Sequence, residues 1–145
     1  MNWKIAIFRK SLLAYNAVCK PLCKELGLSQ TAFDILMFLG NNPEYKTASE
    51  IVEIRHIKAN LVSIHVDRLV QDGYLIRQPV KEDRRKTELI CTEKAQAVIE
   101  QGQELQHAFG DRLFTGMDAD TRNTFFMGMN LIEENLNEIL EAEEK

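Results

Sequence analysis

The stretch that decides the fold is VDRLVQDGYLIRQPVKEDRRKTELICTEK, residues 66–94. It begins as the end of an amphipathic helix and turns at Gly73. Two runs with strand character follow, residues 74–78 and 87–92, and six consecutive charged residues lie at the tip between them, 81–86. A solvated hairpin turn needs only one or two polar residues and usually a glycine. This cluster therefore indicates a role beyond the turn itself.

Three short helices are predicted upstream of this hairpin. Ser29 is a suitable cap for the first, which we expect to stop at Gly40. Thr47 followed by Glu50 is a capping-box sequence that starts the second helix. The third ends at Gly73. Its predicted buried stripe is Val62, Val66 and Leu69.

Longer helices are predicted on both sides of this region. Apolar residues recur every three or four positions from Ile5 to Leu26, and Pro21 inside that pattern predicts a kink or a local loosening of the helix near residues 17–18. Two more helices follow the hairpin, one over residues 95–114 and one started by Asp118 or Asp120. The stripe of the last helix is Phe125, Met129, Ile132, Leu136 and Ile139. The fold class is therefore mostly α, with one small hairpin.

Length and composition indicate one globular domain, or one small domain with appended helices. The chain has 145 residues, of which 45% are hydrophobic and 28% charged. No apolar run approaches the roughly 20 residues of a membrane span. Three cysteines without paired metal-type spacing fit a reducing compartment. We therefore expect a cytoplasmic protein that does not interact with membranes.

Charge is distributed unevenly along the chain, although the net charge is only −4. Residues 46–86 contain nine basic and six acidic side chains. From residue 118 onward there are two basic and eight acidic side chains. Such a polarised chain has a preferred orientation on a polyanion, with its middle towards the negative charges.

Two helices joined by a tight turn, followed at once by a hairpin with a basic tip, form the plan of a winged helix-turn-helix. The sequence resembles the MarR family of bacterial transcriptional regulators. The resemblance is carried by VDRLVQDGYLIR at residues 66–77, by EDRRKTELICTEK at residues 82–94, and by the order of the helices on both sides. It extends from residue 3 to about residue 140.

The resemblance implies a homodimer that binds double-stranded DNA at a pseudo-palindromic operator. Such dimers are usually repressors that a small-molecule ligand or thiol oxidation releases. By position, residues 29–92 would form the winged helix-turn-helix lobe that binds DNA. Residues 1–28 and 93–145 would form the helical dimerisation region.

The same resemblance implies a set of DNA-binding residues. A recognition helix over residues 58–72 would present its first residues to the major groove, Arg68 would lie nearer the backbone, and Asp83 would hold an arginine of the wing tip in place. The expected residues are Lys58, Ala59, Asn60, Ser63, Ile64, Arg68, Asp83, Arg84, Arg85 and Lys86. The family commonly has Ser or Thr where this chain has Lys58, and a basic residue where it has Ile64. An exposed isoleucine can touch a thymine methyl but cannot bond a guanine edge.

Two alternatives to a ligand-released regulator remain open. Cys19 and Cys23 lie one turn apart on the first helix, so a thiol-based redox switch is conceivable, and buried packing is the competing reading. Ile64 and the negative net charge also fit a winged-helix protein-interaction module that does not bind DNA. A basic wing favours DNA binding over that module.

Other site types are not indicated by the sequence. His56, His65 and His107 lack metal-ligand spacing, so we expect neither a metal nor another cofactor. No nucleophile motif or phosphate-binding glycine loop is present, so we expect no enzyme. One group of residues fits either a ligand pocket or ordinary core and dimer packing, namely Phe109, Phe114, Phe125, Phe126, Met127 and Met129.

Overall fold

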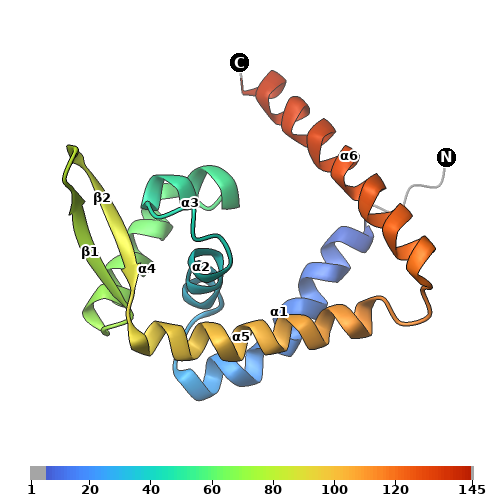
Figure 1. Ribbon diagram of the computed structural model, residues 1–145, viewed down its shortest axis with the longest axis horizontal. Coiled ribbons are helices and arrows are strands. Elements are labelled where there is room, and N and C mark those ends of the chain that lie inside the picture. The colour runs from blue at the N-terminus through green and yellow to red at the C-terminus, as the bar shows by residue number, and fades with distance from the viewer. Residues whose placement is uncertain (1–5, 145) are drawn as a thin grey trace. The chain divides into compact units, whose positions relative to one another are not determined.

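The computed structural model describes residues 6–144, which form six helices and one two-stranded sheet (Figure 1). In chain order the elements are α1 Ala6–Leu26, α2 Gln30–Asn41, α3 Ala48–Arg55, α4 Ala59–Gln71, β1 Leu75–Val80, β2 Asp83–Cys91, α5 Glu93–Leu113 and α6 Ala119–Glu143. The chain divides into two compact units, Met1–Phe109 and Gly110–Lys145. The mostly helical winged-helix class predicted from sequence is confirmed.

The core of the first unit is built around α2, which buries seven of its twelve residues. α1 contributes two buried cysteines to this core, and α4 contributes the predicted stripe of Val62, Val66 and Leu69. α5 adds Val98 and Ile99. Burying each such aliphatic side chain stabilises the fold by roughly 1.5–3 kcal/mol. The core thus holds α4 by one face and leaves its other face in solvent.

The predicted helix starts are confirmed. The Ser29 hydroxyl accepts a hydrogen bond from the Ala32 N–H at 3.1 Å. Thr47 and Glu50 form the reciprocal capping box at the start of α3. Gly73 follows α4 with a φ of +84°, a left-handed conformation that glycine adopts without strain. α1 is one helix through Pro21.

The predicted stop of α2 at Gly40 is wrong by one residue, because α2 continues to Asn41. Gly40 serves helix packing instead. A Cβ atom at this position would lie 2.5 Å from Cγ2 of Ile99 in α5. The missing side chain therefore allows α2 and α5 to approach each other closely.

The hairpin differs from its prediction. β1 and β2 are antiparallel and longer than expected, and the turn consists of only residues 81–82. Pro79 pairs with Thr87 and Val80 with Asp83, so residues 84–86 form a bulge on β2. A proline has no N–H for the ladder, which favours an interruption at this place. The expected six-residue charged tip is therefore wrong, since four of the six residues belong to strand β2.

The second unit contains the end of α5 and all of α6. Asp118 caps α6 by accepting a hydrogen bond from the Thr121 N–H at 2.8 Å. The rings of Phe114, Phe125 and Phe126 pack together, with centroids 5.1–5.7 Å apart. α6 has no buried residue, and its predicted stripe is at least partly exposed along its whole length. Within residues 6–144, every helix is too short or too polar to cross a bilayer.

Candidate nucleic-acid interface

α4 presents a continuous exposed ridge, which includes Asn60, Ser63 and Ile64, beside the hairpin. The helix begins directly after Lys58, which caps it without a side-chain hydrogen bond, and Asp72 closes its other end. The predicted recognition helix, residues 58–72, thus matches α4 with its two caps. All of the expected α4 residues are exposed: Lys58, Ala59, Asn60, Ser63, Ile64 and Arg68.

Both arginines nearest to the ridge form ion pairs. Arg68 Nε lies 3.3 Å from Asp72 on the same helix. Arg77 of β1 reaches across to Asp67 of α4 and pairs with its carboxylate. Arg77 and Asp67 cannot be picked out as a pair from the sequence, because a helix residue and a strand residue ten positions apart give no periodic signal. These pairs reduce the free positive charge on the ridge itself.

Three neighbouring cations lie on the bulge of β2. Arg84, Arg85 and Lys86 are exposed, and none of them forms an ion pair with another residue in the range 6–144. Asp83 Oδ1 accepts a hydrogen bond from the backbone N–H of Arg85 at 3.0 Å. Asp83 therefore contacts Arg85 through its main chain and shapes the bulge that carries the cations.

Two contacts link the hairpin and Tyr74 before it to neighbouring segments, and a third joins α5 to the cap of α4. The Leu89 N–H of β2 donates to the Lys46 carbonyl at 2.7 Å, immediately before α3. Lys94 donates to the Asp72 carbonyl at 2.7 Å and lies 4.3 Å from the centroid of the Tyr74 ring. Such contacts hold the wing and α4 as one surface, which is visible at one end of the first unit in Figure 1.

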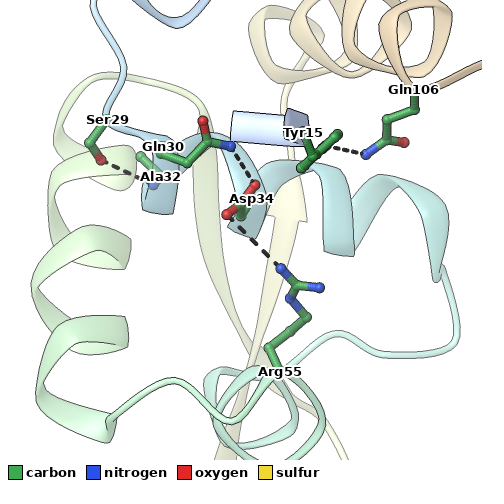
Figure 2. Close-up of polar contacts among 7 residues, drawn as sticks. All are labelled: Tyr15, Ser29, Gln30, Ala32, Asp34, Arg55 and Gln106. Carbon is green, nitrogen blue, oxygen red and sulfur yellow. Dashed lines mark hydrogen bonds and ion pairs between the residues drawn. The ribbon is translucent and has the colours of Figure 1, made fainter. Parts of the chain in front are cut away.

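A polar cavity of about 290 Å³ lies inside the first unit, away from the wing. Its lining residues are Tyr15, Asp34, Met37, Phe38, Asn41, Asn42, Arg55 and Gln106. Figure 2 shows Gln106 donating to the Tyr15 hydroxyl and Asp34 facing Arg55. The shortest nitrogen–oxygen distance between Asp34 and Arg55 is 4.0 Å, and Gln30 donates to Asp34 at 2.9 Å.

Burial changes the acid–base properties of this cavity. It raises the pKa of Tyr15 to about 12, so the phenol keeps its proton at neutral pH. It also raises the pKa of Asp34, although the Gln30 hydrogen bond and the Arg55 charge act in the opposite direction. No sequence pattern predicts this site, since Tyr15 and Gln106 are 91 positions apart.

The two candidate redox cysteines lie in the core. Cys19 is 0% exposed and Cys23 is 6% exposed. Burial raises the pKa of Cys19, and it raises the pKa of Cys23 to about 11. Cys91 is half-buried on β2. These environments suit thiols that pack as small hydrophobic groups more than reactive thiolates.

The histidines considered as metal ligands do not form a metal site in the described part of the chain. In the part of the chain that the structure describes, no three His, Cys, Asp or Glu side chains come together in a way that could hold a metal ion. Nδ1 of His65 lies 3.5 Å from the Ser29 hydroxyl, and His56 adopts a left-handed backbone at the end of α3. Phe109 packs on Tyr15 with a centroid distance of 5.5 Å.

Comparison with known proteins agrees with this geometry. A family model described as MarR family matches residues 26–86. The chain is 36% identical over 93 residues to the HTH-type transcriptional regulator PecS of Dickeya dadantii, a match that covers 63% of this chain and 55% of PecS. It is 22% identical over 120 residues to the HTH-type transcriptional regulator BilQ of Clostridium symbiosum, covering 83% of this chain and 81% of BilQ.

Solved structures share the fold over nearly the whole chain. A MarR-family transcriptional regulator from Listeria monocytogenes, complexed with 26-mer DNA, superposes with a TM-score of 0.85 at 19% identity, covering 94% of this chain and 90% of that one. The regulator PA3341 superposes with a TM-score of 0.83 at 23% identity. The family model, the sequence relatives and the fold all support the MarR family.

Proposed function

We propose that this chain is a DNA-binding transcriptional regulator that acts as a homodimer on a pseudo-palindromic site. The observation that carries the proposal is the single surface formed by the exposed ridge of α4 and the unpaired cations of the wing. A helix of this kind fits the major groove of B-DNA. The relatives PecS and BilQ are named as regulators of transcription, which supports the same role here and no enzymatic one.

The wing supplies the electrostatic part of binding. Arg84, Arg85 and Lys86 are exposed on the bulge and form no ion pair with another described residue, although the charge of Lys86 also acts on Glu50. The two arginines are therefore available for phosphates or for a narrow minor groove. Each phosphate contact releases condensed counterions, and affinity therefore falls steeply with salt. Residues 29–92 would form the lobe that carries both contacts.

Dimerisation would use the helices outside that lobe, residues 1–28 and 93–145. α6 exposes an apolar stripe that includes Leu136 and Ile139, and α1 exposes a cluster that includes Leu12 and Leu13. Contiguous apolar helix faces are usually covered by a partner and are rarely left in water. A twin subunit covering them would place two lobes about one helical turn apart on an inverted repeat.

We further propose repression that a small ligand relieves, with the polar cavity as the effector site. Its donors and acceptors come from α1, α2, α3 and α5 (Figure 2). Arg55 is the last residue of α3 and lies three positions before the cap of α4. A ligand that competes for Arg55 or Asp34 would therefore shift the turn between α3 and α4. The burial of Cys19 and Cys23 favours a ligand over a thiol switch.

The test is fluorescence anisotropy with a labelled duplex selected from a random library, titrated at several salt concentrations. We expect specific binding in the cytoplasmic salt range and a marked loss on replacing both Arg84 and Arg85 by alanine. Arg112→Ala, which removes one exposed positive charge outside the lobe, is the control and should bind normally. Absence of salt-dependent binding to any duplex would favour the protein-interaction module instead.

A further inference from the structure

We propose that α4 reads an A·T-containing core in each half-site, with Ile64 packed on a thymine methyl and Asn60 bonded to an adenine. The inference rests on the proposed DNA binding and names the sequence that the same surface prefers. It follows from the presence of Asn60 and Ile64 on the ridge and from the lack of an unpaired arginine beside them.

Asn60 and Ile64 lie on the ridge directly opposite the buried face of α4. Successive residues of a helix are rotated by about 100°, so positions 60 and 64 fall within about 30° of the direction opposite the core stripe. The two residues are one turn apart, about 6 Å along the axis. Because each base pair in a strand adds about 3.4 Å, they would contact pairs no more than two steps apart.

The ridge lacks a free cation for guanine. Guanine presents two acceptors in the major groove, and arginine or lysine is its usual partner. Arg68, on the flank of the ridge, forms an ion pair with Asp72. Asp67, the next residue along the ridge, is acidic, and it forms an ion pair with Arg77 of β1. The only basic residue at the start of α4 is Lys58, its cap.

Ile64 instead offers an apolar surface. It is 61% exposed in the part of the chain that the structure describes. Among the four bases, thymine alone carries a methyl group in the major groove. Burying that methyl against the isoleucine removes apolar area from water on both sides, which is a favourable change of the size of one buried methylene.

Asn60 has the groups that adenine requires. Its Oδ1 accepts a hydrogen bond from the Leu61 N–H at 3.0 Å. A carbonyl oxygen has a second lone pair, so Oδ1 can also accept from adenine N6, while Nδ2 donates to N7. The local hydrogen bond therefore positions the amide without consuming its capacity for a base.

The experiment uses the full-length wild-type protein and the best duplex selected from a random library. Each thymine is replaced in turn by deoxyuridine, which removes only the methyl group. We expect one position per half-site at which the loss is about fourfold, the equivalent of one buried methylene. Ile64→Ala should bind the thymine duplex about as weakly as wild type binds the deoxyuridine duplex, and should not distinguish the two. Ile76→Ala, which removes an exposed isoleucine of β1, is the control and should keep the full thymine preference.

Asn60 is tested on the same duplex with 7-deazaadenine, which lacks the N7 acceptor. Wild type should lose affinity at an adenine within two base pairs of the sensitive thymine, and Asn60→Ala should be indifferent to the replacement. Wild-type binding that tolerates every deoxyuridine overturns the inference while leaving the proposed function intact. So does an Ile64→Ala variant that still prefers thymine. Failure to bind any duplex refutes the proposed function itself.

Discussion

Arg77 of β1 and Asp67 of α4 form an ion pair that joins the wing to the recognition helix. Their side chains are 44% and 64% exposed, so the pair contributes only about 0–1 kcal/mol to stability. In the proposed DNA complex the pair would matter more, because Asp67 places a carboxylate on the surface that would face phosphates. Arg77 pairs with that carboxylate and offsets its charge.

The first prediction separates neutralisation from direct contact. Arg77→Gln leaves Asp67 unpaired, and we expect weaker DNA binding with an almost unchanged melting temperature. The double variant Asp67→Asn, Arg77→Gln should recover most of the lost affinity, because the uncompensated carboxylate is gone. Anisotropy titrations at constant salt measure both. A double variant as weak as the single one would mean that Arg77 binds a phosphate itself.

The second prediction concerns Asp83, whose carboxylate accepts from the Arg85 N–H. Asp83→Ala removes a negative charge near DNA, which by Coulomb attraction alone would strengthen binding. We expect it to weaken binding, by roughly 1 kcal/mol, the net value of one hydrogen bond, because the bulge loses its shape. Asp83→Asn keeps the acceptor and removes the charge, so it is the matched control and should bind at least as well as wild type. Equal affinity for the two variants would argue that shape is unimportant.

Local signals in the sequence predicted most of the fold correctly. Helix starts at Ser29, Thr47 and Asp118 follow from capping chemistry, which depends on three or four neighbouring residues. The predicted stop of α2 at Gly40 was wrong because this glycine makes room for Ile99, 59 positions away, and does not end its own helix. The hairpin tip was wrong because charged residues are as compatible with an exposed bulge as with a turn.

The candidate site was only partly predictable for the same reason. The exposed residues of α4 and of the wing could be identified from helix periodicity and the family resemblance. The Asp67–Arg77 pair and the cavity between Tyr15, Asp34 and Arg55 join distant elements with no local pattern. Tertiary contacts of this kind become visible only when the elements are placed in space.

The third prediction tests the close approach of α2 and α5. A Cβ atom on Gly102 would lie 2.3 Å from Sδ of Met37 and 3.0 Å from Cζ of Phe33. Both side chains belong to the packed core, so Gly102→Ala should lower the free energy of unfolding by about 1–3 kcal/mol. Gly110→Ala has open space around the new methyl and should raise it by about 0.5–1 kcal/mol. Urea denaturation measures both, and a neutral Gly102→Ala would show that α2 and α5 can separate freely.

The fourth prediction concerns the thiols. Only the thiolate is nucleophilic, and burial both covers Cys19 and Cys23 and raises the pKa of each. We expect slow modification of these two cysteines by a thiol reagent in the folded protein and fast modification in urea. Moderate peroxide should leave DNA affinity unchanged, in wild type and in Cys19→Ser alike. Release of DNA by peroxide in wild type but not in Cys19→Ser would instead support a redox switch.

The fifth prediction concerns Asp34, whose pKa burial raises above the ordinary value of about 3.9. Between that value and the higher pKa of the folded state, the folded protein binds more protons than the unfolded one. Stability is therefore lost as pH rises through this window. Asp34→Asn cannot titrate, so its stability relative to wild type should increase from about pH 4 upward and level off above the folded pKa.

Asp118 provides a control of opposite sign, because its hydrogen bonds with Thr121 lower the pKa of the carboxyl group. Its contribution is complete above the ordinary pKa and is lost only as pH falls below it. The difference between Asp118→Asn and wild type should therefore stay flat from about pH 5 to pH 7. Urea midpoints at half-unit intervals give both curves. A flat curve for Asp34→Asn would mean that Arg55 and Gln30 offset the burial of Asp34 completely, and the cavity would then hold an ordinary carboxylate.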